Sequence, residues 1–365
     1  MKVTMKKERF TFVVDALLER QRKKLLPYNE NGATVPQYLI PDEIRSNTHT
    51  LACFYFFLCI YMRGGIESHT AFRQLIKMWF KHPKFFDPKL ASQIKESEIT
   101  EVLKEYVGWD SKNAARFWSL NAKRLAKQWG SNPLELIKGL SDYNEAVRRI
   151  ARKTTKQKNL DTKDDGFYGF QEKMVSMLLY FYDWEGWLPK FLYPSPADFH
   201  HYRLFIANEA IIVKTSNGNK IRYSKQISAV IRKGLLDYLK ANTNTTTIEL
   251  ADALWLYSFS MCGNSPATIT KVSIDTKELF RKAGIEEWWN FDGWINTRTK
   301  SLAKTCVVCV LGKTCKFGIP ARSYYSRGII ELRPRPQIQY FPTQNEINNS
   351  PTETGEQLLL FKPDK

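Results

Sequence analysis

Three cysteines stand close together near the C-terminal end of the chain, in the stretch TCVVCVLGKTC at residues 305–315. Cys306, Cys309 and Cys315 have the spacing C-x2-C-x5-C, although the whole chain holds only six cysteines. Thiolates bind soft and borderline metals, and a gap of two residues lets two thiolates reach one metal centre without strain. The spacing therefore indicates a metal site, with three separate buried thiols as the alternative.

Three ligands leave one coordination position open, and Cys262 is the best candidate for the fourth. It ends the helical stretch TIELADALWLYSFSMC and precedes a Gly-Asn pair that commonly stops a helix, so its thiolate can point toward another segment. Cys53 and Cys59 lie inside the very apolar stretch 51–62 and are expected to be buried packing residues. Four thiolates suit either a 4Fe–4S cluster or Zn²⁺.

The segment around the cysteine triplet is strongly basic, because residues 298–335 hold nine Lys and Arg side chains and one acid, Glu331. A metal that staples such a loop would make a rigid surface for phosphate groups. The cations expected to contact DNA are Arg298, Lys300, Lys304, Lys313, Lys316 and Arg322.

The net charge of the whole chain also indicates an anionic partner. It has 55 Lys and Arg against 37 Asp and Glu, a formal net charge of +18 with a pI near 9.5, which favours a polyanion such as double-stranded DNA as partner. The N-terminal stretch has charges within its apolar part and lacks the small-residue cleavage site of a signal peptide. No apolar run is long enough for a membrane span. We therefore expect a cytoplasmic, nucleoid-associated protein.

Helical patterning dominates the chain and predicts an all-α body. Apolar residues recur at i, i+3 and i+4 spacing in the segments 8–26, 49–63, 69–80, 112–128, 141–153, 170–183, 196–212, 222–240 and 247–262. The stretch 210–224 reads either as a short hairpin around its Asn-Gly pair or as a loop. After residue 336 the composition turns polar, which indicates a flexible tail at 336–365.

A possible catalytic acid lies in the stretch PSPADFHHYR at residues 194–203. Capping preferences predict Ser195 as the helix N-cap, Pro196 as the first helical residue and Asp198 at position N3. An acid at N3 often does no more than satisfy free N–H groups and the helix dipole. The sequence by itself therefore leaves a capping role and a catalytic role open for Asp198.

These two motifs together resemble the helix–hairpin–helix DNA glycosylase superfamily. The spacing of the cysteine triplet matches the last three cysteines of the C-x6-C-x2-C-x5-C iron–sulfur loop of the endonuclease III and adenine-glycosylase type, and ADFHHYR is similar to the superfamily's segment around the catalytic aspartate. Archaeal oxoguanine glycosylases are similar in the region around Asp198. Queuosine-salvage N-glycosidases are also similar in this region. The chain departs from the pattern at Thr299, where the family has its first cysteine, and it lacks the usual Gly-rich hairpin before Lys173.

The resemblance implies a two-lobed helical body with a cysteine-stapled loop. Residues 1–110 would be an N-terminal helical region without a recognised motif, and residues 111–335 a glycosylase-like domain with the cysteine-cluster loop at 298–335. It implies that Asp198 stabilises an oxocarbenium-like transition state and activates water, and that Lys173, if it acts as a nucleophile, adds a Schiff-base lyase step.

A base that is flipped out of the duplex also needs a pocket of aromatic and polar side chains. The residues expected to form it are Trp184, Trp187, His200 and His201. The expected function is thus base-excision DNA N-glycosylase. Two alternatives stay open, namely an N-glycosidase that acts on a free modified nucleoside or nucleotide, and a non-catalytic DNA-binding protein with a zinc module.

The end of the polar tail carries the apolar peptide QLLLF. It resembles the Q-L-x-L-F pentapeptide by which bacterial replication and repair proteins bind the sliding clamp. The matching residues are Gln357, Leu358, Leu360 and Phe361. A glutamine that hydrogen-bonds and two apolar side chains that fill a groove suit such a role, with docking onto the protein's own body as the alternative.

Overall fold

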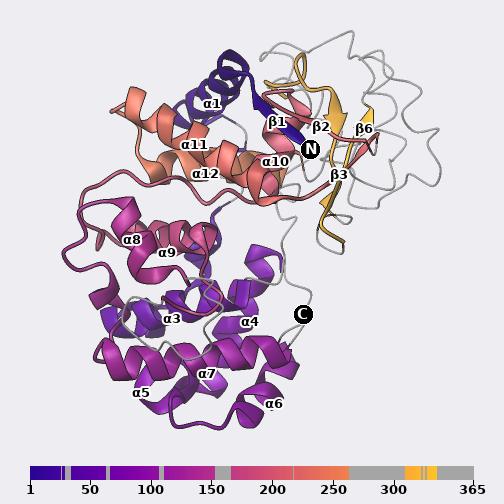
Figure 1. Cartoon of the computed structure of the whole chain (residues 1–365). Coiled ribbons are helices and arrows are strands. Elements are labelled where there is room, and N and C mark those ends of the chain that lie inside the picture. Colours follow the sequence, from indigo (N-terminus) through magenta and orange to yellow (C-terminus); the bar gives the residue numbers. More distant parts are fainter. Residues whose placement is uncertain are drawn as a thin grey trace, which may run out of the picture. The chain divides into compact units, whose positions relative to one another are not determined.

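The computed structural model describes residues 1–25, 27–28, 34–62, 66–106, 111–152, 166–216, 218–262, 309–321, 324 and 327–334. These residues are mostly helical, as the sequence pattern predicted (Figure 1). They divide into two compact units, one made of Met1–Thr34 with Ala197–Lys365 and the other of Val35–Pro196. We call them unit 1 and unit 2. No described helix has the length and apolar character needed to cross a membrane.

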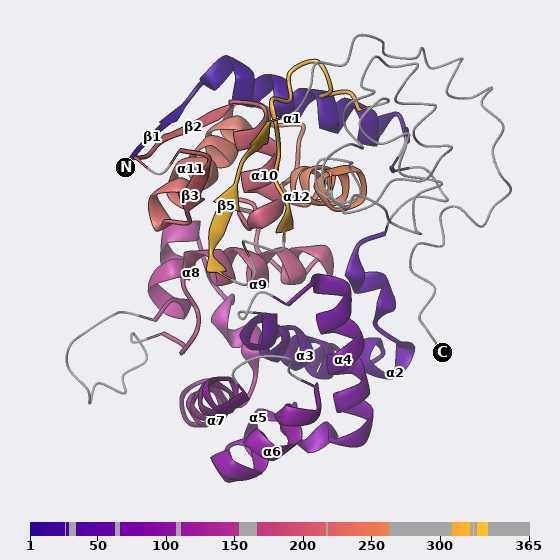
Figure 2. The same cartoon turned by 90° about the vertical axis from the view of Figure 1, so that its right-hand side faces the viewer.

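Unit 1 is built from two distant parts of the chain. Its elements are β1 (Lys2–Met5), α1 (Lys7–Arg22), α10 (Phe199–Ala207), β2 (Ile211–Lys214), β3 (Lys220–Arg222), α11 (Lys225–Ala241), α12 (Thr247–Tyr257), the π-helical turn η6 (Ser258–Cys262), β4 (Phe317–Gly318), β5 (Ile329–Glu331) and β6 (Arg333–Pro334). Helix α10 packs against α1, α11 and α12, which can be followed in Figure 2.

The strands of unit 1 form three antiparallel pairs, β1 with β2, β3 with β5, and β4 with β6. In the first pair Met5 lies opposite Ile211, and in the second Ile221 lies opposite Ile330. The stretch 210–224 was predicted as a hairpin or a loop, and both interpretations are wrong. Its two halves are strands, and each pairs with a distant segment instead of with the other.

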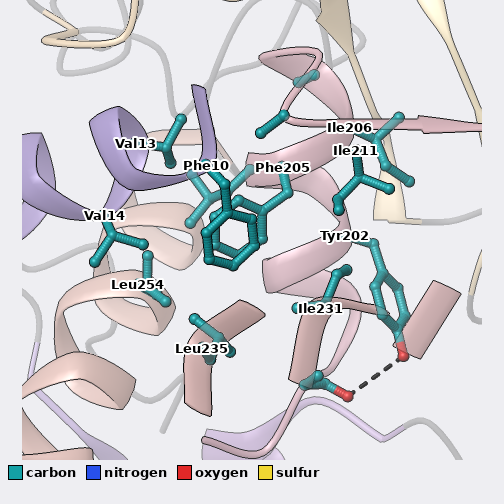
Figure 3. Packing of buried hydrophobic residues seen from close by; sticks show 14 of the residues in the cluster. Phe10, Val13, Val14, Tyr202, Phe205, Ile206, Ile211, Ile231, Leu235 and Leu254 are labelled. Carbon is teal, nitrogen blue, oxygen red and sulfur yellow. Dashed lines mark hydrogen bonds between the residues drawn. The ribbon is translucent and has the colours of Figure 1, made fainter. Parts of the chain in front are cut away.

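The core of unit 1 joins α1 to helices from the other end of the chain (Figure 3). The rings of Phe10 and Phe205 stack with their centroids 4.1 Å apart and their planes 6° apart. Gly234 of α11 lies so close that a Cβ atom there would come within 2.8 Å of the Phe10 ring. Burial of apolar side chains at such close packing is the main contribution to folding stability. The first 22 residues are therefore part of the core of unit 1.

The described elements of unit 2 are all helices, and one isolated β-bridge joins Ala151 to Phe167. The helices are η1 (Pro36–Leu39), α2 (Asp42–Arg45), α3 (Thr48–Tyr61), α4 (Ser68–Lys81), η3 (Pro83–Phe85), α5 (Pro88–Ala91), α6 (Glu96–Tyr106), α7 (Ser111–Gln128), η4 (Pro133–Leu136), α8 (Tyr143–Ile150) and α9 (Glu172–Trp184). Helix α7 packs against α5 and α6, and α9 packs against α3 and α8 (Figure 1).

Helix α3 forms the centre of unit 2 because it is apolar on every side. All its residues from Leu51 to Tyr61 are buried, as expected for a helix without a polar face. The ring of Phe57 stacks on that of Trp118 at 4.4 Å, and the Trp118 indole N–H donates to the carbonyl oxygen of Phe85 at 2.7 Å. Cys53 and Cys59 are buried in this helix, which confirms that they are packing residues.

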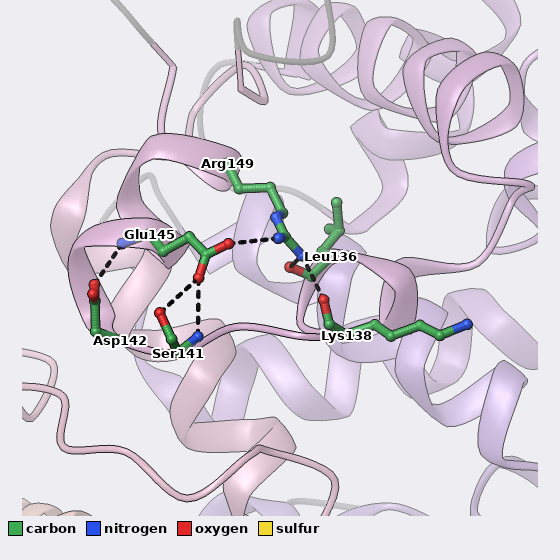
Figure 4. A network of polar contacts seen from close by, with 6 residues as sticks. All are labelled: Leu136, Lys138, Ser141, Asp142, Glu145 and Arg149. Atoms are coloured by element: carbon green, nitrogen blue, oxygen red, sulfur yellow. Dashed lines mark hydrogen bonds and ion pairs between the residues drawn. The ribbon is translucent and has the colours of Figure 1, made fainter.

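A polar network fastens α8 to the turn that precedes it (Figure 4). The Arg149 guanidinium donates to Glu145 at 2.8 Å and to the carbonyl oxygen of Lys138 at 2.7 Å. The backbone N–H and hydroxyl of Ser141 also donate to Glu145, and these hydrogen bonds with the Arg149 charge hold the pKa of the Glu145 carboxyl below its ordinary value. Asp142 caps the helix by accepting from the Glu145 N–H at 2.8 Å.

The observed division of the chain differs from the boundary expected near residue 110. Helices α6 and α7 lie on either side of that position and pack against each other within unit 2, while the first 34 residues belong to unit 1. The cysteine loop from residue 298 is described only from Cys309 onward, and the tail 336–365 lies outside the described residues.

Candidate active site

Asp198 is the N-cap of α10. Its backbone is extended, and its carboxylate accepts a hydrogen bond from the backbone N–H of His200 at 2.9 Å. The predicted position N3, with Ser195 as the cap, was therefore wrong by three residues. Ser195 is fully buried, and the helix begins only at Phe199. The Asp198 carboxylate lies at the positive end of the α10 dipole, where a negative charge is stabilised.

His201 completes the cap from inside the protein. Its Nδ1 lies 2.9 Å from the Asp198 Oδ1 and 3.4 Å from the Asp198 backbone N. A carboxylate only accepts, so the first contact needs a proton on Nδ1, whereas the second needs Nδ1 without one. The shorter distance favours the protonated nitrogen, which donates to the carboxylate. The His201 side chain is almost fully buried, while that of Asp198 keeps 15% of its surface exposed.

Beside this pair, His200 contacts two aromatic side chains, Trp255 of α12 and Phe259 of η6. Its Nδ1 lies 3.2 Å from the Ser258 hydroxyl, and its ring stands edge-on to Trp255 at 5.5 Å and edge-on to Phe259 at 5.9 Å. Trp255 and Phe259 stack on each other at 4.8 Å with planes 8° apart, and both are partly exposed. The π-helical turn η6 carries Ser258 and Phe259, and π-helical turns often occur at functional sites.

The Arg203 side chain joins α10 to two other segments of unit 1. Its Nε donates to the carbonyl oxygen of Ile319 at 2.8 Å and an Nη donates to that of Ser258 at 3.2 Å. The guanidinium also lies 4.5 Å from the centre of the Phe199 ring. A buried cation needs such partners to offset its desolvation. Arg203 thus fixes α10 to the π-helical turn and to the segment that follows the cysteines.

Sequence reasoning missed Trp255, Phe259 and Arg203. Trp255 and Phe259 are four residues apart, which places them on one face of a helix. Core residues of a helix have the same spacing, and the pattern alone does not show that the two rings are exposed. Arg203 stands within the ADFHHYR stretch, but its burial depends on carbonyl groups from distant segments.

The other residues predicted to take part in catalysis or base binding are Lys173, Trp184 and Trp187, and they lie in unit 2. Lys173 is half-buried in the first turn of α9. It lies near Cys59, whose thiol pKa is raised well above its ordinary value by burial, while the Lys173 charge opposes that rise. The Trp184 ring is edge-on to Tyr38 at 5.8 Å, and Trp187 packs at 5.7 Å from a tyrosine of α9. Within the described residues of unit 1, His200 and His201 are the predicted pocket residues that lie next to Asp198.

One of the four predicted metal ligands, Cys309, contacts a tyrosine of α12. The Tyr257 hydroxyl donates to the Cys309 sulfur at 3.2 Å. Burial raises the Tyr257 pKa well above its ordinary value, and the thiols of Cys309 and Cys262 add to that rise. The Cys315 thiol donates to a backbone carbonyl at 3.4 Å. Cys306 lies outside the described residues, and among those described no three His, Cys, Asp or Glu side chains are grouped to hold a metal.

Of the cations predicted to contact DNA, Lys313 and Lys316 are described, and both are exposed. Arg298, Lys300, Lys304 and Arg322 lie outside the described residues, as do Gln357, Leu358, Leu360 and Phe361 of the tail peptide. No model of a known protein family matches the chain, and no curated protein is significantly similar to it.

Proposed function

We propose that this protein is a DNA N-glycosylase that uses Asp198 as its catalytic carboxylate. The observation that carries the proposal is the position of this carboxylate, partly exposed at the start of α10 and oriented by His201 and the His200 N–H. The two contacts complete the helix cap, and they also hold the carboxylate in one orientation and favour its charged form, both of which a catalytic carboxylate needs.

The proposed reaction breaks the N-glycosidic bond with water. As the base departs with the electron pair of the bond, positive charge develops on the sugar, and the Asp198 carboxylate stabilises it. The same carboxylate takes a proton from the water molecule that attacks the anomeric carbon, and this proton then passes to the departed base. The products are the free base and an abasic sugar, and Asp198 is ionised again. His201 does not touch the sugar in this scheme, and serves as a positioning residue for Asp198.

The partly exposed rings of Trp255 and Phe259 support the proposal of a base pocket in unit 1. A base that has left the duplex stack loses its stacking partners, and aromatic side chains can replace them. His200 is two residues from Asp198 in the sequence, and its ring contacts those of Trp255 and Phe259. Its imidazole is therefore suited to hydrogen-bond the edge of the flipped base. Trp184 and Trp187 lie in unit 2, and their part in base binding stays a prediction.

Several cations of unit 1 form no ion pair within the described part of the chain, and they favour DNA over a free nucleoside as the substrate. A hollow of about 580 Å³ at the start of α1 is lined by Lys6, Lys7, Glu8, Arg9 and Phe12. Its three cations form no ion pair with any described residue. Lys2 and Lys214 lie directly opposite each other in the β1–β2 pair, an arrangement of like charges that is unfavourable unless an anion lies nearby. Phosphate groups of DNA would supply such anions.

Release of free bases from duplex oligonucleotides tests this function. Each duplex carries one modified or mismatched base, and the purified full-length chain is expected to release at least one of these bases while leaving unmodified duplex intact. Duplex binding should weaken steeply with salt, because cations that contact phosphates displace counterions. Hydrolysis of free modified nucleosides without activity on any duplex would favour the nucleoside N-glycosidase alternative, and salt-dependent binding without any hydrolysis would favour the non-catalytic one.

We further propose that Cys262, Cys306, Cys309 and Cys315 hold a 4Fe–4S cluster, with Zn²⁺ as the alternative. The support is the position of Cys262, Cys309 and Cys315, whose side chains all pack against the core of unit 1. Such a centre would fix the basic loop to the end of α12 without taking part in the reaction.

Protein purified without oxygen is expected to show a broad absorption band near ~400 nm, together with bound iron. Cys309→Ala should remove most of both signals, because a cluster with three thiolates is bound less firmly. Cys53→Ala, which deletes a thiol buried in unit 2, serves as the control and should keep them. Equal iron and absorbance in both variants would rule out Cys309 as a ligand.

The tail peptide Gln357–Phe361 is proposed to bind the bacterial sliding clamp. Full-length protein should be retained on immobilised clamp, whereas Leu360→Ala/Phe361→Ala should be lost, because the two side chains fill an apolar groove. Recovery of both forms in equal amounts would exclude this peptide as the contact.

A further inference from the structure

The outer face of α4 in unit 2 combines cations with an exposed aromatic ring. The inner face of this helix buries His69, Ala71, Phe72, Leu75 and Met78. It packs there against η1, α3, η3 and α6. Residues three and four apart share one face of a helix, so Arg73, Lys77, Phe80 and Lys81 lie together on the opposite side.

This face carries positive charge that no described residue neutralises through an ion pair. Within the described residues Arg73, Lys77 and Lys81 form no ion pair, and α4 itself contains no Asp or Glu between its first and last residue. Other lysines of unit 2 do have partners, since Lys84 binds Glu98 at 2.7 Å and Lys104 binds its neighbour Glu101 at 2.6 Å. The three cations of α4 are thus available to an anionic partner.

Phe80 adds a flat apolar surface to these charges. Its side chain is 52% exposed, although its ring is held edge-on against Trp79 with centroids 5.3 Å apart. A ring fixed in this way presents a face to the solvent at little entropic cost on binding. Cations that follow a phosphate backbone, together with an aromatic ring on which a base can stack, are the two elements that bind single-stranded nucleic acids.

We propose that the outer face of α4, formed by Arg73, Lys77, Phe80 and Lys81, binds single-stranded nucleic acid. A duplex uses only the cations of such a face, because the faces of its bases are covered by their neighbours in the stack. An acidic peptide would also use the cations, but it has no requirement for an aromatic plane. This binding surface is independent of Asp198 and of the proposed base excision.

Stacking is tested by the affinity of the full-length chain for a labelled single-stranded oligonucleotide, measured by fluorescence anisotropy. Phe80→Ala is expected to weaken binding about 10-fold, because one base loses its aromatic partner. Phe80→Trp keeps a ring and should bind like the wild type. Leu90→Ala is the matched control, since Leu90 is another apolar side chain of unit 2 with 46% of its surface exposed. Equal affinity of Phe80→Ala and Leu90→Ala would overturn the proposal.

The cations are tested by the salt dependence of the same binding. Lys77→Gln/Lys81→Gln should reduce the slope of log K against log salt by about 1.4, because a single strand contributes about 0.7 for each neutralised phosphate. Lys89→Gln/Lys240→Gln removes the same charge from exposed lysines elsewhere and should leave the slope unchanged. DNA and RNA strands of one sequence should both respond, since both offer phosphates and stackable bases.

Two further measurements separate this surface from the proposed active site. Asp198→Asn should bind the single strand like the wild type, whether or not base excision occurs. Phe80→Ala should bind a fully paired duplex like the wild type. If Phe80→Ala weakened binding of duplex and single strand equally, a stacking role for this face would be excluded.

Discussion

Asparagine in place of Asp198 is expected to lower the rate of base release about 100- to 10,000-fold, which is the size of effect seen when a catalytic acid–base or charge-stabilising group is removed. The amide has no negative charge to stabilise the sugar cation and cannot accept the proton of the attacking water. Asparagine caps helices as well as aspartate does, so its side-chain oxygen can still accept from the His200 N–H. The substitution therefore removes the proposed catalytic function while it retains the cap.

Asp142→Asn is the matched control for this experiment. Asp142 is also an N-cap aspartate, which accepts from the Glu145 N–H at 2.8 Å in unit 2. The Asp142→Asn variant should release bases at the full wild-type rate. Wild-type rates in Asp198→Asn would show that Asp198 is only a cap, and the proposal of an active site at α10 would be withdrawn.

Trapping with borohydride addresses Lys173 separately. A Schiff base between the Lys173 amine and the sugar would be reduced to a stable DNA adduct, and Lys173→Gln would not form it. An adduct in the wild type alone supports a lyase step. Base release without any adduct leaves Asp198 acting by itself.

The long helices could be predicted from the sequence because their patterns are local. The segments 49–63 and 170–183 coincide closely with α3 and α9, because the apolar spacing of each segment comes from one continuous helix. The start of α10 could not be predicted in this way. Ser195-Pro196 has the ordinary form of a helix start, but Ser195 is buried, and the cap at Asp198 is stabilised by a histidine side chain in place of the usual glutamate.

The assembly of unit 1 depends on contacts that no local pattern contains. Strand β1 pairs with β2, with Thr4 opposite Ile212, and periodicity gives no information about partners so far apart in the chain. The same limit applies to the candidate site. Its carboxylate could be proposed from a short motif, whereas its aromatic pair and Arg203 became recognisable only through distances between separate helices.

The second large effect is expected for Phe10→Ala, which should lower the free energy of unfolding of unit 1 by about 3–5 kcal/mol. The Phe10 side chain is 3% exposed and stacks on Phe205 of α10, while Gly234 of α11 leaves no space on its other side. Alanine would leave a cavity between three helices, because the surrounding backbone cannot close around it. Hydrogen exchange of peptides from α10 and α11 should accelerate, while peptides from α3 in unit 2 should exchange as before.

Phe12→Ala provides the comparison, since Phe12 stands two residues further along the same helix with 43% of its side chain exposed. Its removal should change the exchange of α10 little, because an exposed ring loses few contacts. If both variants exchanged alike, α1 would not contribute to the core that supports Asp198. If only Phe10→Ala accelerates exchange, the first 22 residues are required to hold α10 in place. Any loss of base release in that variant would then follow from the loss of packing, while the carboxylate and His201 remain chemically intact.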